Sequence, residues 1–526
     1  MTMQLDGSGG ATTRTGLRVA VVGAGVSGVV TARVLTAVGF AVTVFEKADD
    51  IGGVWSATRA YPGVATQDDR RSYSFSGMAM PSHVAQHPLG AEVQTYLAEY
   101  LAAGVPQSQV RLSTQVLRAD LIDGDTWQVD SVGPRGRVTE MFDWLVAANG
   151  VFSTPYVPDW PGREEFEAAG GRVITPGSLA DGAVLDDRRT VVVGWGKTAC
   201  DVAVHAATRG TATAVVARTL TWKYPKQLGL AGLTFRHLVL TRAGERLIGT
   251  RYRSVTGRLL LRRIPERIPR VLLGKAIARA VDRTTGLSEL GLLPNTEVRT
   301  SNSLVTDGFF EAVADGRIRV HRERSVATLG NGPDGPYVEL SDGQRLAADV
   351  VVAATGYEQG ADFLSPEVLQ RGATSDGSLL LHNRVLAVDV PRLAFIGWAH
   401  SFRSPLTSEI AAVWLAGVLL GQVALPTPER QRARADRFPV ARVRMSSRIN
   451  NALPPVTLKD LDRVLDELGL PLPWSIRVRQ IWRPIDPADY AAALEAFLQR
   501  HSGLTPEQIT AHPTAQRSMM SRNTGS

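Results

Sequence analysis

The chain has 526 residues, of which 44% are hydrophobic and 21% charged, and its net charge is +7. This length exceeds what one hydrophobic core usually organises, so it predicts two domains or more. The composition is that of a globular protein, and it contains no run of about eighteen apolar residues that could span a bilayer. The single cysteine, Cys200, excludes an intramolecular disulfide, a redox-active dithiol and a cysteine-rich zinc site.

Residues 1–16 are rich in Gly, Ser and Thr. They lack the basic and then apolar regions of a secretion signal. We therefore expect a loose N-terminal tail and a cytoplasmic protein.

The segment Leu17–Lys47 has the pattern of a strand, a tight turn, a helix and a second strand. Its turn carries G-x-G-x-x-G at Gly23, Gly25 and Gly28. Glycines at these positions allow the tight turn, a close approach of the backbone to a pyrophosphate, and close packing of helix on strand. Glu46 ends the second strand, where a carboxylate can accept hydrogen bonds from ribose hydroxyls. This first unit predicts a dinucleotide site.

A second unit of the same kind runs from Thr190 to Arg218. Its turn contains Gly194, Gly196 and Ala199 at the corresponding offsets. A P-loop is excluded, because the glycine that it requires five places before Gly196 is Val191.

The second unit ends in Arg218 where the first ends in an acid. A guanidinium binds a 2′-phosphate through paired hydrogen bonds, whereas a carboxylate repels it. The second site is therefore predicted to prefer NADPH over NADH, with Lys223 as an additional cation. The second strand ends in an acid in the first unit and in an arginine in the second, and the chain has no pair of redox cysteines. This combination indicates FAD that is reduced by NADPH and then passes its electrons to oxygen.

The residues around these units resemble the class B flavoprotein monooxygenases, a family that includes flavin-containing monooxygenases, N-hydroxylases and Baeyer-Villiger enzymes. The resemblance extends over nearly all of the chain up to about Pro426. The segments that carry it, in the order of the family, are Gly-Gly-Val-Trp at 52–55, a Tyr-Pro-Gly loop that starts at Tyr61, Val-Ala-Ala-Asn-Gly at 146–150, Val351–Tyr357, residues 394–398 and residues 404–414.

This resemblance implies the activity. NADPH reduces FAD, dioxygen forms a C4a-(hydro)peroxyflavin, and bound NADP⁺ protects this adduct until a small-molecule substrate arrives. The implied catalytic residues are Gln67, Arg70 and His400. Ser404 starts a predicted helix whose positive end could stabilise a reduced flavin. The other residues expected to contact a cofactor are Val26, Ser27, Lys47, Gly53, Val54, Trp55, Val116, Lys197, Thr198, Thr355, Gly356 and Leu406.

Two departures from the family pattern bear on the reaction. Gln67 stands where flavin-containing monooxygenases have Asn and Baeyer-Villiger enzymes have Asp. In the segment that resembles the Baeyer-Villiger fingerprint, Thr175 replaces the histidine and Ala168 the glycine. A neutral Gln67 favours an electrophilic oxygen donor suited to amines and sulfides. The attack on ketones needs a peroxide anion, which Arg70 or Arg71 could support. N- or S-oxygenation is the preferred hypothesis, and Baeyer-Villiger oxygenation of a ketone is the alternative.

The predicted fold class is α/β, with two Rossmann-like domains and a helical C-terminal region. The FAD domain is expected in two pieces, 15–165 and 345–425, with the NADPH domain inserted at 166–344. Residues 426–505 are predicted to be helical, and residues 506–526 to form a polar tail. No histidine spacing suggests a metal site.

Between Arg236 and Arg283 there are thirteen Arg or Lys residues and three acids. This stretch belongs to a predicted helical excursion, residues 230–285, which is expected to form a lid or a solvated face. A flavin-containing binding protein, or a protein that docks on a membrane through 236–283, in either case without oxygenase activity, is a less favoured alternative. Nucleic-acid binding is not expected, since no recognised module accompanies the charge. The sequence leaves the oligomeric state open.

Overall fold

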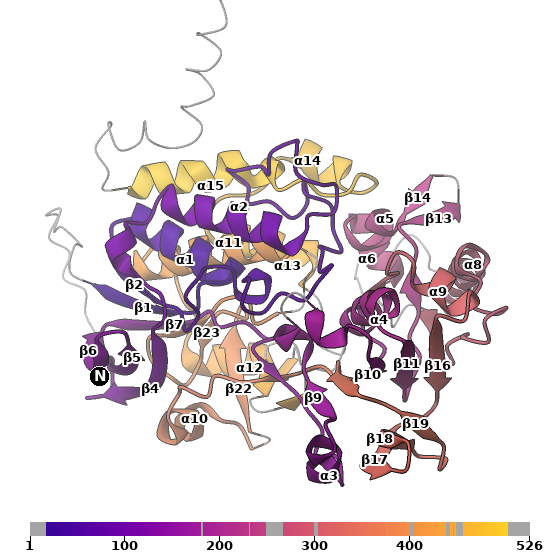
Figure 1. Cartoon of the computed structure of the whole chain (residues 1–526). Coiled ribbons are helices and arrows are strands. Elements are labelled where there is room, and N and C mark those ends of the chain that lie inside the picture. The colour runs from indigo at the N-terminus through magenta and orange to yellow at the C-terminus, as the bar shows by residue number, and fades with distance from the viewer. Residues whose placement is uncertain are drawn as a thin grey trace, which may run out of the picture.

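A computed structural model of the chain shows two sheet-centred units, with C-terminal helices packed on the first (Figure 1). It describes residues 17–179, 182–230, 232–248, 267–298, 303–375, 377–399, 401, 403–437, 442–444, 447–448 and 456–502. The predicted N-terminal and C-terminal tails therefore lie outside the described residues.

The first unit is built on an eight-stranded sheet. Strands β1 and β2 pair in parallel, with Arg18 opposite Ala41, and β7 pairs in parallel on the other side of β1. In order across the sheet the strands are β25 (Arg442–Arg444), β22 (Ser378–His382), β23 (Leu386–Ala387), β24 (Leu393–Phe395), β7 (Trp144–Ala147), β1 (Arg18–Val22), β2 (Ala41–Phe45) and β3 (Val110–Arg111).

Both faces of this sheet are covered, as the apolar sequence of β1 requires. Because successive side chains of a strand point to opposite faces, Val19 and Val21 join one core while Ala20 and Val22 join another. The helices of the first core are α1 (Val26–Ala37), α2 (Gly90–Ala102), α11 (Ser404–Leu419), α13 (Leu458–Glu467) and α15 (Ala488–His501). The second core involves β4 (Gln115–Ile122), β5 (Thr126–Gly133), β6 (Gly136–Phe142) and α10 (Pro366–Gly372).

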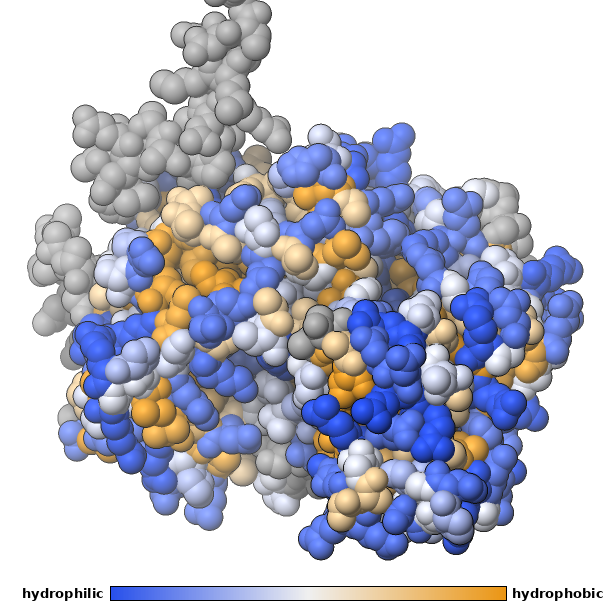
Figure 2. Space-filling model, viewed as in Figure 1, coloured by the Kyte–Doolittle hydropathy of each residue, from blue (hydrophilic) through white to orange (hydrophobic). Residues whose placement is uncertain are grey.

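The second unit has a five-stranded parallel sheet with α4 (Lys197–Arg209) and α9 (Phe309–Ala314) on one face. Its strand order is β16 (Ile318–Arg322), β11 (Ala212–Ala217), β10 (Arg189–Val193), β20 (Val350–Ala353) and β9 (Arg172–Ile174). The other face carries α3 (Arg163–Ala168), β17 (Val326–Gly332), β18 (Gly335–Leu340) and β19 (Arg345–Ala347). On the face seen in Figure 2 this unit presents mainly hydrophilic side chains, whereas hydrophobic side chains form patches on the first unit.

The excursion after β11 is largely helical where it is described. It contains β12 (Lys223–Tyr224), β13 (Gln227–Leu230), β14 (Leu233–Thr234), α5 (Phe235–Val239), α6 (Arg242–Ile248), α8 (Arg267–Thr285) and β15 (Ser303–Leu304). Ion pairs of two of its basic residues point inward, whereas Lys226 pairs with the exposed Asp307. Arg236 pairs with Asp69 at 2.7 Å and Arg242 with Asp462 at 2.5 Å, so both cations are held against the first unit.

The two units are joined by a small antiparallel sheet of β8 (Thr154–Pro155), β21 (Tyr357–Gln359) and β26 (Ser447–Arg448). This connection corrects the predicted boundaries. Strand β20 pairs with β10 in the second unit, so the chain returns to the first unit after Ala353 and not at residue 345. Helix α3 already packs in the second unit, so the outward crossing precedes residue 163.

In its described parts, the region predicted as C-terminal helices contains helices joined by loops, and the two short strands β25 and β26. Besides α13 and α15 it contains α12 (Pro428–Arg437) and α14 (Trp474–Arg479). Leu461, Leu465 and Phe497 are buried in the same core as α1 and α11. This region therefore completes the first unit.

Candidate active site

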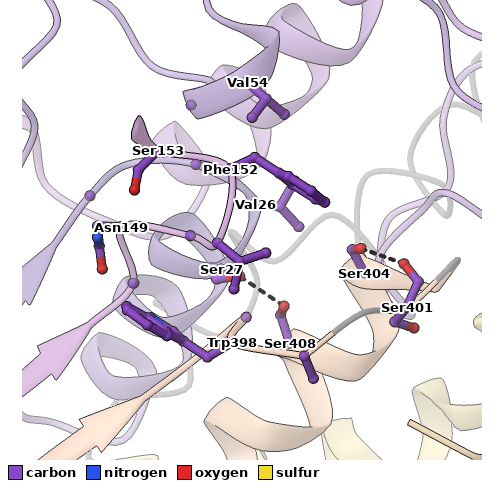
Figure 3. A pocket seen from close by; sticks show the side chains of 18 of the residues that line it. Val26, Ser27, Val54, Asn149, Phe152, Ser153, Trp398, Ser401, Ser404 and Ser408 are labelled. Atoms are coloured by element: carbon purple, nitrogen blue, oxygen red, sulfur yellow. Dashed lines mark hydrogen bonds between the residues drawn. The ribbon is translucent and has the colours of Figure 1, made fainter. Parts of the chain in front are cut away.

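A cavity of about 650 Å³ lies between the two units and is lined by both glycine-rich turns. Figure 3 shows part of its wall, with Val26 and Ser27 from the start of α1, Phe152 from the loop after β7, and Ser404 and Ser408 from α11. The carboxyl ends of the parallel strands β1 and β10 meet at this cavity, which is where open α/β sheets bind ligands.

In the first turn the three glycines have different physical roles. Gly23 has φ +104°, and a Cβ there would lie 2.8 Å from the carbonyl oxygen of Ala148. A Cβ on Gly28 would lie 1.8 Å from the carbonyl oxygen of Gly23, so this glycine lets α1 pack against the strand end. A Cβ on Gly25 would make only an ordinary contact, 3.5 Å from Cα of Gly53. Gly25 lines the cavity, and the space beside it fits a phosphate that approaches the backbone.

Glu46 lines the cavity from the end of β2 and also stabilises the turn. Its Oε2 accepts a hydrogen bond from the backbone N–H of Ala24 at 2.7 Å, and its Oε1 accepts one from Ala48 at 2.9 Å. Each carboxylate oxygen can accept more than one hydrogen bond, so Glu46 can still receive ribose hydroxyls.

The second turn repeats this division of roles. Gly194 has φ +140°, and a Cβ there would lie 2.2 Å from the carbonyl oxygen of Ala354. Gly196 has no heavy atom within 4 Å of an added Cβ, and it lines the cavity at the start of α4. The middle glycine of each turn is therefore left open on the cavity side, as a bound pyrophosphate requires. The two turns fit two dinucleotides, FAD and NADPH.

Most of the predicted site residues come together around this cavity. Those that line it are Gly23, Gly25, Val26, Ser27, Glu46, Lys47, Gly53, Val54, Trp55, Gln67, Val116, Gly196, Lys197, Thr198 and Ser404. Gly28, Gly194 and Ala199 lie behind the wall and serve packing. Arg218 is exposed and does not line the cavity, so its phosphate contact stays a prediction. His400 lies outside the described residues.

Five further predicted site residues do not line the cavity, so their predicted roles stay predictions. Lys223 is buried, and its Nζ donates to the carbonyl oxygen of Trp195 at 2.6 Å. Arg70 donates to the carbonyl oxygen of Val84 at 3.0 Å, within its own loop. Leu406 is fully buried in the core on α11.

Thr355 and Gly356 belong to the link between the units. The Thr355 hydroxyl donates to the carbonyl oxygen of Tyr156. The backbone N–H of Tyr156 in turn donates to the carbonyl oxygen of Gly356. Their contacts hold the crossing strands together, and neither residue lines the cavity.

The start of α11 is built into the cavity wall. The hydroxyls of Ser27 and Ser408 share a hydrogen bond of 2.9 Å, which joins α1 to α11 (Figure 3). Ser404 donates to the carbonyl oxygen of Ser401 at 2.8 Å in the first turn of the helix. The first turns of this sixteen-residue helix line the cavity with Ser404, Thr407 and Ser408. Stabilisation of a reduced flavin by the positive end of the helix stays a prediction.

Comparisons with known proteins assign the chain to a family. The model of the flavin-binding monooxygenase-like family matches residues 16–437. The chain belongs to this family. It is 25% identical to the probable flavin-containing monooxygenase 1 of Arabidopsis thaliana over 91% of this chain and 97% of that one. It is 22% identical to human flavin-containing monooxygenase 1 over 80% and 78% of the two chains.

Solved structures share the fold of this flavin monooxygenase. Cyclohexanone monooxygenase from Rhodococcus sp. Phi1, bound to NADP⁺, matches with a TM-score of 0.61 and 18% identity, over 93% of this chain and 98% of that one. S-allyl-L-cysteine S-oxygenase from Allium sativum matches with a TM-score of 0.55 and 17% identity, over 95% and 98% of the chains. The expected α/β fold, the class of NADPH-dependent flavin monooxygenase and the cofactors FAD and NADPH are confirmed.

The loop that starts at Tyr61 connects the two units of this flavin monooxygenase. Gln67 accepts a hydrogen bond at its Oε1 from the backbone N–H of Leu304, at 3.0 Å, so its side chain reaches β15 of the excursion. Trp55 donates to the hydroxyl of Tyr73 at 3.0 Å, and the two rings form an edge-to-face pair in the cavity wall.

No sequence pattern singles out Asp68, which lines the cavity beside Gln67. Its carboxyl is buried, and neither oxygen has a hydrogen-bond partner in the described structure. Burial raises the pKa of Asp68 to about 8. Acidic residues are common in loops, and only the fold shows that this one faces inward. Other cavity residues that were missed are Arg59, Tyr61, Tyr73, Asn149, Thr407 and Ser408.

Within the described ranges, no group of three His, Cys, Asp or Glu residues is arranged to hold a metal ion. No described helix is long and apolar enough to cross a membrane.

Proposed function

We propose that this flavin monooxygenase transfers one oxygen atom from dioxygen to the nitrogen or sulfur atom of a small organic substrate. The first glycine-rich turn, with Glu46, holds FAD, and the second turn, with Gly196 and Lys197, holds NADPH. When bound, FAD that has been reduced by NADPH supplies the activation of dioxygen. The residues of the chain bind and orient the reactants, exclude water and control protons.

The choice of heteroatom oxygenation rests on one observation, the lack of charge on Gln67 and Asp68 in the loop that lines the cavity. Gln67 has no charge, and its amide oxygen is used by Leu304. Because burial raises the pKa of Asp68 to about 8, this carboxyl is mostly protonated at neutral pH. A neutral, proton-bearing wall disfavours an anionic oxygen donor and suits electrophilic transfer to an amine or a sulfide.

The two arginines that could support an anionic oxygen donor, Arg70 and Arg71, contact other groups of the protein. Arg70 donates to Val84, and Arg71 pairs with Asp486 at 2.6 Å near the surface. This arrangement further supports N- or S-oxygenation.

Baeyer-Villiger oxygenation of a ketone is the second candidate. Two other arginines, Arg236 and Arg403, lie near enough to Asp68 to lower its pKa, although less than burial raises it. These cations could stabilise an anionic donor if a bound reactant lies close to them.

Product analysis tests the proposal. The FAD-loaded enzyme is supplied with NADPH and oxygen, and NADPH consumption, hydrogen peroxide release and oxygenated product are measured for matched series of amines, sulfides and ketones. We expect oxygenated amine or sulfide with little peroxide. Lactone or ester formation from ketones alone would replace the proposal with the second candidate, and stoichiometric peroxide with all substrates would contradict both.

For the described parts of the basic stretch, residues 236–248 and 267–283, we propose the role of a lid or solvated face beside the cavity, whose wall contains none of these residues. The described start of the stretch is fixed inward by the pairs Arg236–Asp69 and Arg242–Asp462, which supports a lid more than a lipid-binding face. Vesicle binding at low salt, measured by co-sedimentation with anionic liposomes, would contradict this role.

A further inference from the structure

Asp68 is the strongest unexplained feature of the cavity wall. Its side chain is only 2% exposed and lines the cavity, yet neither carboxyl oxygen accepts a hydrogen bond within the described structure. A buried polar group without a partner costs roughly 1–3 kcal/mol, and a charged one costs more. Such a group in a cavity wall is explained if a ligand supplies the missing partner.

The charges around Asp68 show which kind of partner is missing. Arg236 on α5 pairs with Asp69 at 2.7 Å, and Arg403, just before α11, pairs with Glu245 at 2.6 Å. Each guanidinium thus has a carboxylate of its own. Asp68 is the third carboxyl beside these two arginines. When Asp68 is ionised, the cluster therefore lacks one positive charge.

The terminal nitrogens of both arginines also have other partners, whereas the Nε of each is buried without one. Arg236 donates to the hydroxyl of Ser72 at 2.9 Å, and Arg403 donates to the carbonyl oxygens of Val239 and Val456 at 3.3 and 2.5 Å. These contacts fix both side chains away from the Asp68 oxygens, with which they form no ion pair within 4 Å in the described structure.

The remaining titratable neighbours are neutral at neutral pH. Burial raises the pKa of Tyr73, and burial lowers the pKa of His87, which packs near the backbone of this loop. Neither can act as the counter-charge. Tyr73 and Trp55 instead add an aromatic pair to the same wall, and aromatic rings attract cations.

We propose that Asp68 forms a subsite for an organic cation, an alkylammonium group carried by the substrate. The proposal rests on the proposed function for the existence of a substrate, and it adds that the oxygenated nitrogen or sulfur is a different atom from the ammonium nitrogen. A substrate held at Asp68 by its cationic group would present its uncharged heteroatom to the flavin site, and the ion pair would leave this wall without net charge. Uncharged substrates of the same shape would bind less well.

Binding of the cation is linked to a proton. A permanent cation binds best to the ionised carboxylate, and the pKa of free Asp68 is about 8. Below that value the proton must leave before the ion pair forms, so affinity should rise as pH rises from about 6 to about 8. Below the pKa, the ionised fraction of Asp68 rises about tenfold for each pH unit. The affinity for the cation should therefore increase about tenfold or more over this range.

The test uses two ligands of nearly the same shape, choline and its uncharged isostere 3,3-dimethylbutan-1-ol. Choline cannot be oxygenated at its quaternary nitrogen, so binding is measured without turnover. Isothermal titration calorimetry on the full-length, oxidised, FAD-loaded enzyme, at constant ionic strength near pH 6, 7 and 8, should show choline binding that tightens with pH. The uncharged isostere should bind more weakly and without this pH dependence.

Asp68→Asn keeps the shape of the side chain and removes its charge. We expect this variant to lose most of the choline affinity and all of its pH dependence, with unchanged flavin content and Tm. Asp315→Asn, which makes the same charge change at an exposed site in the second unit, is the matched control and should bind choline like the parent. Equal binding of the two ligands, or wild-type choline binding by Asp68→Asn, would overturn the proposal. Because no oxygenation is measured, this result is independent of the test of the proposed function.

Discussion

The hydroxyl of Tyr61 donates a hydrogen bond to Oδ2 of Asp201, 3.0 Å away, and this contact joins the two units of the enzyme across the cavity. Asp201 is a buried residue of α4, and its Oδ1 also accepts from the hydroxyl of Thr306 at 2.6 Å and pairs with Lys197. Burial raises the pKa of Tyr61, so the phenol stays a donor at all physiological pH values. The loop beside the flavin site is thereby fixed to the helix that starts at the second glycine-rich turn.

Tyr61→Phe removes this contact while leaving the ring in place. A hydrogen bond to a charged group contributes about 1.5–3 kcal/mol, and the two cofactor sites should become less well aligned. We expect reduction of the flavin by NADPH, followed by stopped-flow absorbance, to slow about tenfold or more. Tyr337→Phe, on the antiparallel sheet of the second unit, is the control. An unchanged reduction rate in Tyr61→Phe would show that the contact does not position the cofactors.

The glycines of the two turns should respond differently to the same small substitution. Gly196→Ala meets no atom of the protein, so its Tm should equal that of the parent, but the added methyl group occupies the space proposed for the NADPH pyrophosphate. We expect the KM for NADPH to rise about tenfold or more. Gly28→Ala places its Cβ 1.8 Å from the carbonyl oxygen of Gly23, and overpacking of this kind costs about 1–3 kcal/mol. Its Tm and flavin content should both fall. A normal KM for Gly196→Ala would contradict the proposed NADPH site.

Arg218→Ala tests the coenzyme preference that the sequence predicts. If the exposed guanidinium at the end of β11 binds the 2′-phosphate, the variant should lose about 1.5–3 kcal/mol of discrimination between NADPH and NADH, measured as the ratio of kcat/KM for the two coenzymes. Arg317→Ala is the control, because Arg317 precedes the neighbouring strand β16 and so lies at the amino ends of the parallel strands, opposite to Arg218. If the parent enzyme used both coenzymes equally, the assignment of Arg218 would be wrong.

Glu409 should make the stability of the enzyme depend on pH. Its carboxyl is buried on α11 and accepts two hydrogen bonds of 2.8 Å from the N–H and the hydroxyl of Ser76. Burial raises its pKa to about 7 from the ordinary value of 4.5, so the folded state binds a proton that the unfolded state releases. The free energy of unfolding should therefore fall as pH rises from about 5 to about 7. Glu409→Gln should flatten this part of a plot of Tm against pH, and a slope equal to that of the parent would exclude this role.

The sequence by itself determined the parts of the enzyme that depend on local geometry. Two nucleotide-binding turns could be predicted from the glycines at 23, 25 and 28, the acid at 46, and the repeated glycines at 194 and 196. Local sequence is sufficient here because a tight turn, a helix start and a strand end are set by residues close together in the chain. The arginine at 218 predicted the coenzyme in the same way, although its contact awaits a test. The order of the family segments predicted the flavin monooxygenase class.

Only the tertiary structure decided which side chains share the cavity. Arg70 and Lys223 have the right charge for their predicted roles, yet one is used by a nearby carbonyl group and the other is buried under Trp195. Asp68 has no sequence signal that separates it from Asp69, and its environment comes from Arg236 and Arg403, which lie more than 160 residues away in the sequence. Burial and long-range pairing set the charge of such groups. The turns that bind the cofactors could therefore be predicted from the sequence, whereas the side chains of the cavity wall that faces the substrate could not.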